Sequence, residues 1–207
     1  MGAGALLDFG RFGFTDQPTL PDSIRAGADV VLSSADKLIG SSQAGLIMGK
    51  AALVQKIRKD PLARILRVGK LTLAALEATL GLFFDEATAL RTVPTLAMLA
   101  RDLPDIAAQA DRIAAAVRQA APAAHVNCVG GSSQMGSGSM PTQTIATRLV
   151  AVASDKVSAD DLAARLRKSE PPVIARIHEG RVLIDPRTLL AGDEAPLVAA
   201  LTAALST

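Results

Sequence analysis

Apolar and polar positions in the first third of the chain alternate between strand-like and helix-like patterns. Residues 28–33 and 43–49 are short apolar runs that predict two buried strands. The intervening segment, residues 34–42, consists mostly of small and polar residues and predicts a loop. A helix is expected to begin near Ala51, directly after the second strand. The pattern is that of an α/β protein.

Two further helices are predicted in the first half. Asp60 followed by proline is a typical N-cap and first-turn pair, and it predicts a helix over 62–67. Residues 71–84 form the most apolar helical pattern, with very few polar side chains around its circumference. A helix of this kind is buried on most sides. We therefore expect a neighbouring domain or another subunit to cover it.

The second half predicts a compact α/β module with the order α-β-β-α-β-β-α. Its expected elements are a helix over 94–120 that Pro104 kinks or splits, strands over 125–129 and 142–153 around a Gly/Ser loop over 130–139, a helix over 159–168 with Ser158 as its cap, a hairpin of 173–178 and 181–185, and a last helix over 194–205. We expect two domains, 1–93 and 94–207.

Composition narrows the class of protein. The chain has 207 residues, of which 49% are hydrophobic and 20% charged, which is typical of a folded chain and excludes a disordered one. No run of about 20 strongly apolar residues predicts a membrane span. The net charge is only +2 and the basic residues are dispersed, so a dedicated nucleic-acid surface is not indicated. A single cysteine excludes an internal disulfide, and we expect a cytoplasmic protein with no membrane attachment.

Lys37 is the most informative single residue. It follows a predicted strand and lies among small residues, at the kind of strand end where open α/β sheets bind ligands. A lysine amine there could bond covalently to a carbonyl cofactor if its pKa were lowered. From the residues alone, a solvated surface lysine is the favoured interpretation. His125 and His178 are isolated in the sequence, and no metal site is expected.

Four sequence blocks resemble one known family. They are Ser34-Ala-Asp-Lys-Leu-Ile-Gly-Ser-Ser-Gln-Ala-Gly-Leu-Ile-Met-Gly-Lys50, the block from Asp60 to Leu80, Ser133-Gln-Met-Gly-Ser-Gly-Ser-Met-Pro141, and Pro172-Val-Ile-Ala-Arg-Ile-His-Glu-Gly-Arg-Val-Leu-Ile-Asp185. In this order they resemble bacterial selenocysteine synthase, L-seryl-tRNA(Sec) selenium transferase. The resemblance spans nearly the whole chain, and it implies that the chain corresponds to the C-terminal portion, about half, of a usual family member.

The resemblance implies a fold, a cofactor and a reaction. The fold would be the α/β architecture of fold-type-I transferases that use pyridoxal 5'-phosphate (aspartate-aminotransferase-like), with the end of the large cofactor domain at 1–93 and the small C-terminal domain at 94–207. Lys37 would hold pyridoxal 5'-phosphate, and Asp36 matches an active-site carboxylate. Arg64 and Arg67 match arginines that bind the anionic selenium donor. Two arginines three residues apart would share one face of a helix, although a solvated basic face is the plainer reading of that spacing.

The same resemblance implies partners. The substrates would be seryl-tRNA(Sec), bound through a domain not present in this chain, and selenophosphate. The products would serve selenocysteine biosynthesis, and family members are homo-oligomers built from dimers in a ring. Two alternatives stay open: a non-catalytic truncated remnant, or a related β-eliminating lyase that acts on a small amino acid and depends on pyridoxal 5'-phosphate.

The sequence departs from the family at the loop that follows Lys37. The family usually has Gly-Gly-Pro where this chain has Gly40-Ser41-Ser42. Serine at 41 is a mild change unless the position requires a positive φ angle, and serine in place of proline at 42 is expected to loosen the loop.

Overall fold

The structure is a computed structural model that describes residues 3–15, 18–135 and 143–206. By its internal contacts the chain divides into two units. The first comprises residues 1–100 and 134–144, and the second comprises residues 101–133 and 145–207. The first break between the units falls after residue 100. Among the described residues, no helix is long and apolar enough to cross a membrane.

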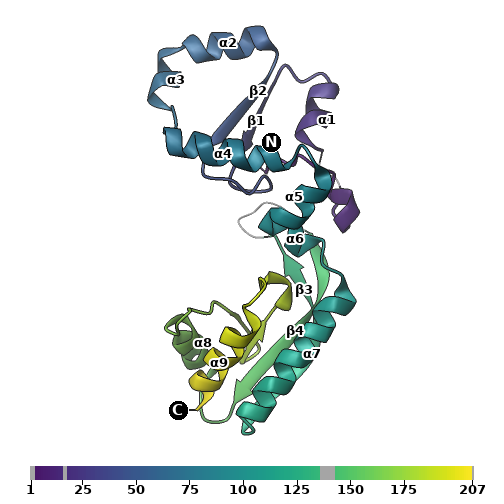
Figure 1. The fold of residues 1–207 in the computed structure, drawn as a ribbon, viewed down its shortest axis with the longest axis vertical. Helices are drawn as coiled ribbons and strands as arrows, with labels where there is room; N and C mark the ends of the chain where they lie inside the picture. The colour runs from purple at the N-terminus through teal and green to yellow at the C-terminus, as the bar shows by residue number, and fades with distance from the viewer. Residues whose placement is uncertain (1–2, 16–17, 136–142, 207) are drawn as a thin grey trace. The chain divides into compact units, whose positions relative to one another are not determined.

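The first unit is a small α/β unit built around a two-stranded sheet (Figure 1). Its elements are η1 (Phe9–Phe12), α1 (Leu20–Arg25), β1 (Val30–Ser34), β2 (Gly45–Gly49), α2 (Ala51–Lys59), α3 (Pro61–Ile65), α4 (Lys70–Leu82), α5 (Glu86–Thr92) and α6 (Pro94–Leu99). Strands β1 and β2 pair antiparallel over their whole length, with Leu32 opposite Ile47. Leu20 of α1, Val31 of β1 and Ile39 of the following loop form the buried cluster that holds this sheet in place.

The most apolar helix is not covered within this chain. In α4 only Leu76 is buried, and Leu71 is 81% exposed. The described part of the chain therefore does not cover this helix, and its burial by another subunit stays a prediction. The exposed leucines of this helix form an apolar surface that no described residue of the chain covers.

The second unit is a four-stranded antiparallel sheet with helices on one face (Figure 1). Its elements are α7 (Leu103–Ala120), β3 (Ala124–Gln134), β4 (Thr144–Ser154), α8 (Ala159–Arg167), β5 (Arg176–His178), β6 (Arg181–Ile184), η2 (Pro186–Thr188) and α9 (Glu194–Leu205). The strand order is β3-β4-β6-β5, so β3 and β5 are the edges. Apolar residues of α7, α8 and α9 pack on Val150, Val152 and Val182 in one cluster that forms the core.

Strand β3 is longer than the sequence pattern predicts. Residues 130–134, expected to begin a Gly/Ser loop, continue the strand instead. A Cβ added at Gly131 would lie 2.5 Å from Cδ1 of Leu149, so the glycine allows close packing on the neighbouring strand, and it has no positive φ that a turn would require. The rest of the predicted loop and the predicted strand start at Thr142 lie largely or wholly outside the described residues.

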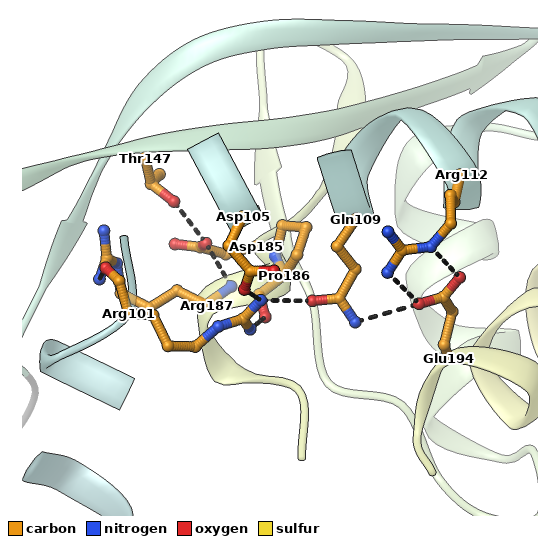
Figure 2. Close-up of polar contacts among 9 residues, drawn as sticks. All are labelled: Arg101, Asp105, Gln109, Arg112, Thr147, Asp185, Pro186, Arg187 and Glu194. Atoms are coloured by element: carbon orange, nitrogen blue, oxygen red, sulfur yellow. Dashed lines mark hydrogen bonds and ion pairs between the residues drawn. The ribbon is translucent and has the colours of Figure 1, made fainter. Parts of the chain in front are cut away.

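A polar network ties η2 to α7 and α9 within the second unit (Figure 2). Arg101 donates to the Pro186 carbonyl at 2.5 Å and to Gln109 at 2.7 Å. Gln109 donates in turn to Glu194 at the start of α9, and Arg112 donates to the same carboxylate at 3.2 and 3.3 Å. These contacts fix the segment that follows β6 on the helical layer.

Candidate functional site

Lys37 lies in a short loop directly after β1, and backbone hydrogen bonds fix the shape of that loop. The Ala35 amide donates to the Ala44 carbonyl at 2.9 Å, and the Ser41 amide donates to the Ala35 carbonyl at 2.9 Å. Leu38 and Ile39, the next two residues, are buried. Because these neighbours anchor the loop in the core, the Lys37 amine is held at a defined place while remaining 31% exposed.

The side chains of Ser34, Asp36 and Lys37 meet at this loop. The Lys37 Nζ atom lies 3.5 Å from Ser34 Oγ and 3.7 Å from Asp36 Oδ1. Ser34 donates its hydroxyl hydrogen to Asp36 Oδ1 at 2.5 Å. This hydrogen bond is the main cause that lowers the pKa of Asp36; partial burial opposes it and the positive charge of Lys37 adds to it. The result is an ionised carboxylate beside an accessible amine.

These three residues line a cavity of about 1470 Å³ that lies wholly in the first unit. Its other walls come from β2, α2 and α3. Lys56 and Arg58, near the end of α2, also line it, together with Gln43. The Lys37 amine suits a carbonyl group and a cation of α2 suits a phosphate group, so the residues present fit pyridoxal 5'-phosphate, the predicted cofactor.

Lys56 and Arg58 were missed from the sequence. They belong to a run of basic residues in the last turn of α2, which resembles an ordinary solvated helix end. Nothing in the linear pattern connects them with Lys37. Only the packing of α2 over β2 brings them to the same cavity.

The loop after Lys37 keeps its backbone unstrained with serine at positions 41 and 42, where the family usually has glycine and proline. Gly40 has a positive φ of 74°, whereas Ser41 is not among the residues with positive φ, so serine causes no backbone strain there. The Ser41 hydroxyl is buried without a hydrogen-bond partner in the described part of the chain. Ser42 donates to the Thr72 carbonyl of α4 at 3.2 Å. The expected loosening at 42 is therefore opposed by a contact that proline could not make.

The helical pairing expected for Arg64 and Arg67 is wrong. Helix α3 is capped by Asp60, whose side chain accepts from the Leu62 amide as predicted, but the helix ends at Ile65 and Arg67 follows it in irregular structure. The two side chains therefore do not share a helix face. Both are exposed, and within the described ranges neither has an ion-pair partner.

The two histidines lie in the second unit, His125 on β3 and His178 on β5. His125 lies 3.1 Å from Asp155, and His178 lies 3.8 Å from Glu179. In the part of the chain that the structure describes, no group of three or more His, Cys, Asp and Glu residues could hold a metal ion.

Substituting Ser34 by alanine is expected to raise the pKa of Asp36 towards its ordinary value. The hydroxyl is the largest cause of the lowered pKa, so its removal favours the protonated carboxyl. Carboxyl-carbon NMR titration of Asp36 measures the shift. Ser42→Ala, whose hydroxyl bonds to Thr72 instead, is the matched control and should leave the Asp36 titration unchanged. An equal shift in both variants, or none in Ser34→Ala, would contradict the assignment.

Comparison with known proteins places the chain in one family. It matches the family described as L-seryl-tRNA selenium transferase (SelA) over residues 1–190. It is 43% identical over 202 residues to the L-seryl-tRNA(Sec) selenium transferase of Geobacter sulfurreducens, covering 97% of this chain and 44% of that protein. It is 42% identical over 207 residues to that of Geobacter metallireducens, covering 100% of this chain and 45% of that protein.

The fold is also similar to a solved structure, that of a D-glucosaminate-6-phosphate ammonia-lyase. The TM-score is 0.54 at 23% sequence identity, covering 88% of this chain and 45% of that one. The predicted fold-type-I α/β architecture is thereby confirmed, and pyridoxal 5'-phosphate, the predicted cofactor, is that of the family. The chain spans less than half the length of the two curated relatives named above. With a family match over 190 of its 207 residues, it belongs to the L-seryl-tRNA(Sec) selenium transferase family.

Proposed function

We propose that this chain forms the lysine-bearing portion of an enzyme that converts seryl-tRNA(Sec) to selenocysteinyl-tRNA(Sec) with selenophosphate as selenium donor. The observation that carries the proposal is the Lys37 amine, held in a large cavity beside an ionised carboxylate. The first unit would be the end of the cofactor domain and the second the small domain. The whole activity is assigned to the longer enzyme, since the chain covers less than half of its relatives.

Each residue of the cavity would have a distinct task. Pyridoxal 5'-phosphate, when bound, supplies an electron sink that allows the β-hydroxyl of the seryl group to leave. Lys37 would hold the cofactor through Nζ and, once released, move the proton at the substrate α-carbon. Asp36, kept ionised by Ser34, would hold the Lys37 amine in place. Lys56 or Arg58, which lie on different sides of α2, would pair with the cofactor phosphate.

Addition of pyridoxal 5'-phosphate to the purified chain tests this assignment. We expect a yellow absorbance, and borohydride reduction followed by peptide mapping should locate one label per chain on Lys37. Labelling scattered over many lysines, or none, would contradict the cofactor role and favour the alternative of a non-catalytic remnant. Turnover of free serine or cysteine by the loaded chain would favour the second alternative, a β-eliminating lyase.

Arg64 and Arg67 would bind the selenium donor as separate cations rather than as a pair on one helix face. Their exposed guanidinium groups have no carboxylate partner in the described chain, which leaves both available for an anion. Replacing both by glutamine is expected to weaken binding of thiophosphate, a stable stand-in for selenophosphate, by about tenfold or more. Calorimetric titration measures it, and Arg25→Gln, an exposed arginine of α1, is the control. Equal affinity in the double variant would refute the role.

The remaining partners follow from the same proposal. Seryl-tRNA(Sec) would be bound chiefly through a part of the enzyme outside this chain. The exposed apolar surface of α4 suits assembly into a dimer-based homo-oligomer. We place the enzyme in the cytoplasm, with selenocysteine synthesis.

A further inference from the structure

The second unit has a sheet face with a cavity that the proposed reaction does not use. Residues on alternate strand positions point away from α7, α8 and α9, and there Leu149, Ala151 and Leu183 form a separate small cluster with Val129. Within the described residues, every member of this cluster belongs to a strand, and no helix residue is part of it. A cavity of about 440 Å³ lies over it, lined by residues from all four strands and the β5–β6 turn.

Three basic side chains gather at this cavity. Arg176 and His178 are two residues apart on β5, so they lie on the same face of the sheet. The strand register places Arg181 of β6 directly opposite His178. Directly opposite and diagonal neighbours on such a face are about 5 and 7–8 Å apart, which lets the three groups act on one bound anion. The hairpin thus concentrates basic residues that are dispersed in the sequence.

The local charge is positive after internal pairing is counted. Arg181 donates to Glu179 at 2.8 Å, and His178 lies 3.8 Å from the same carboxylate. Glu179 is the only acidic residue that lines the described cavity. Arg176 reaches across the face to the Ser132 carbonyl of β3 at the long distance of 3.4 Å. One carboxylate therefore faces two arginines and a histidine.

The wall opposite the hairpin is almost bare backbone. Gly130, Gly131 and Ser132 of β3 line it, and a side chain at Gly131 would have to displace Leu149, whose Cδ1 lies 2.5 Å from the position of an added Cβ. Glycines within a strand are typical of places where a ligand or another backbone approaches closely. This gives a role to the start of the Gly-rich stretch, whose composition predicts a loop.

We propose that this face, the Arg176 groove, binds the sugar-phosphate backbone of RNA. The inference rests on the proposed function, whose substrate is attached to a tRNA. Arginine forks bind phosphate oxygens in pairs, and exposed arginines favour an extended polyanion over a small anion, because several phosphates act together and release counterions. No aromatic side chain lines the described cavity, so the contact is with the backbone rather than with stacked bases.

Fluorescence anisotropy of a labelled tRNA, titrated with the 207-residue chain at several salt concentrations, tests the proposal. Arg176→Gln/Arg181→Gln is expected to weaken binding about tenfold or more near 0.1 M salt. The slope of log K against log salt should become less steep by about 1.5, as expected for two lost phosphate contacts. Arg167→Gln/Lys168→Gln, which removes the same charge at the end of α8, is the control and should bind like the unchanged chain.

Several results would overturn the inference. An equal loss of tRNA affinity in the control pair, or no loss in the groove variant, would do so. Competition by inorganic phosphate as effective as by tRNA would indicate a small-anion site. Competition by poly-glutamate as effective as by tRNA would indicate an acidic protein partner. If the double variant is unfolded by circular dichroism, Arg176→Gln alone, at an exposed edge position, must show about half the change in slope. Labelling of Lys37 by pyridoxal 5'-phosphate is measured separately, so failure of the proposed function is distinguishable from failure of this site.

Discussion

Lys37→Ala is expected to abolish covalent retention of pyridoxal 5'-phosphate. The other groups around the cofactor can bind its phosphate, but only an amine placed in the cavity can bond to its carbonyl carbon. We expect the borohydride-stable label to fall from about one per chain to background. Absorbance after removal of free cofactor, together with mass spectrometry of the reduced chain, measures the loss. The expected effect is complete rather than graded.

Two controls separate chemistry from charge and folding. Lys37→Arg keeps the positive charge beside Asp36 but removes the nucleophilic amine, so it should lose the label while the Asp36 pKa remains low. Lys59→Ala removes a lysine near the cavity that does not line it, and it should retain full labelling. A retained label in Lys37→Ala would show that another lysine, Lys56 foremost, holds the cofactor.

Local signals predicted most elements because their stereochemistry is short-range. Asp60 and Ser158 cap helices as expected, since a side-chain oxygen that accepts from a nearby amide depends on only three or four residues. The helix from Glu194 to Leu205 and the hairpin around Glu179-Gly180 were likewise predicted, and Glu179 has a positive φ of 49° that the tight turn requires.

The predictions were wrong where tertiary packing, or the end of a helix, overrides the local sequence pattern. Gly130 and Gly131 resemble a loop, yet both belong to β3, where Gly131 packs closely against Leu149 of the neighbouring strand. Arg67 looked helical because the apolar pattern continues past Ile65, although the helix ends there. Of the candidate site, the sequence predicts Lys37 from its place after a strand and Asp36 from a sequence block. The grouping of Ser34, Lys56 and Arg58 with them depends on their placement in three dimensions.

Arg187→Met is expected to destabilise the second unit by about 3–5 kcal/mol. Arg187 is 5% exposed, and its guanidinium donates to the Ser133 hydroxyl at 3.2 Å and to the Ala146 and Arg101 carbonyls at 2.8 and 3.3 Å. Burial lowers its pKa, and Asp185 opposes that effect. Methionine fills much of the volume but leaves these acceptors and the Asp185 carboxylate without a cation, which is the costly case for a buried charge.

Arg112 provides the matched comparison, because it is also an arginine of the second unit in a polar network (Figure 2). Its side chain is 59% exposed and its partner, Glu194, is 34% exposed, so water already solvates both. Arg112→Met should cost at most about 1 kcal/mol. Urea unfolding of the 207-residue chain, followed by far-ultraviolet circular dichroism, measures both variants. Similar small losses would show that the Arg187 contacts are replaceable by water, and the Ser133, Asp185 and Arg187 cluster would then not be what holds β3, β4 and η2 together.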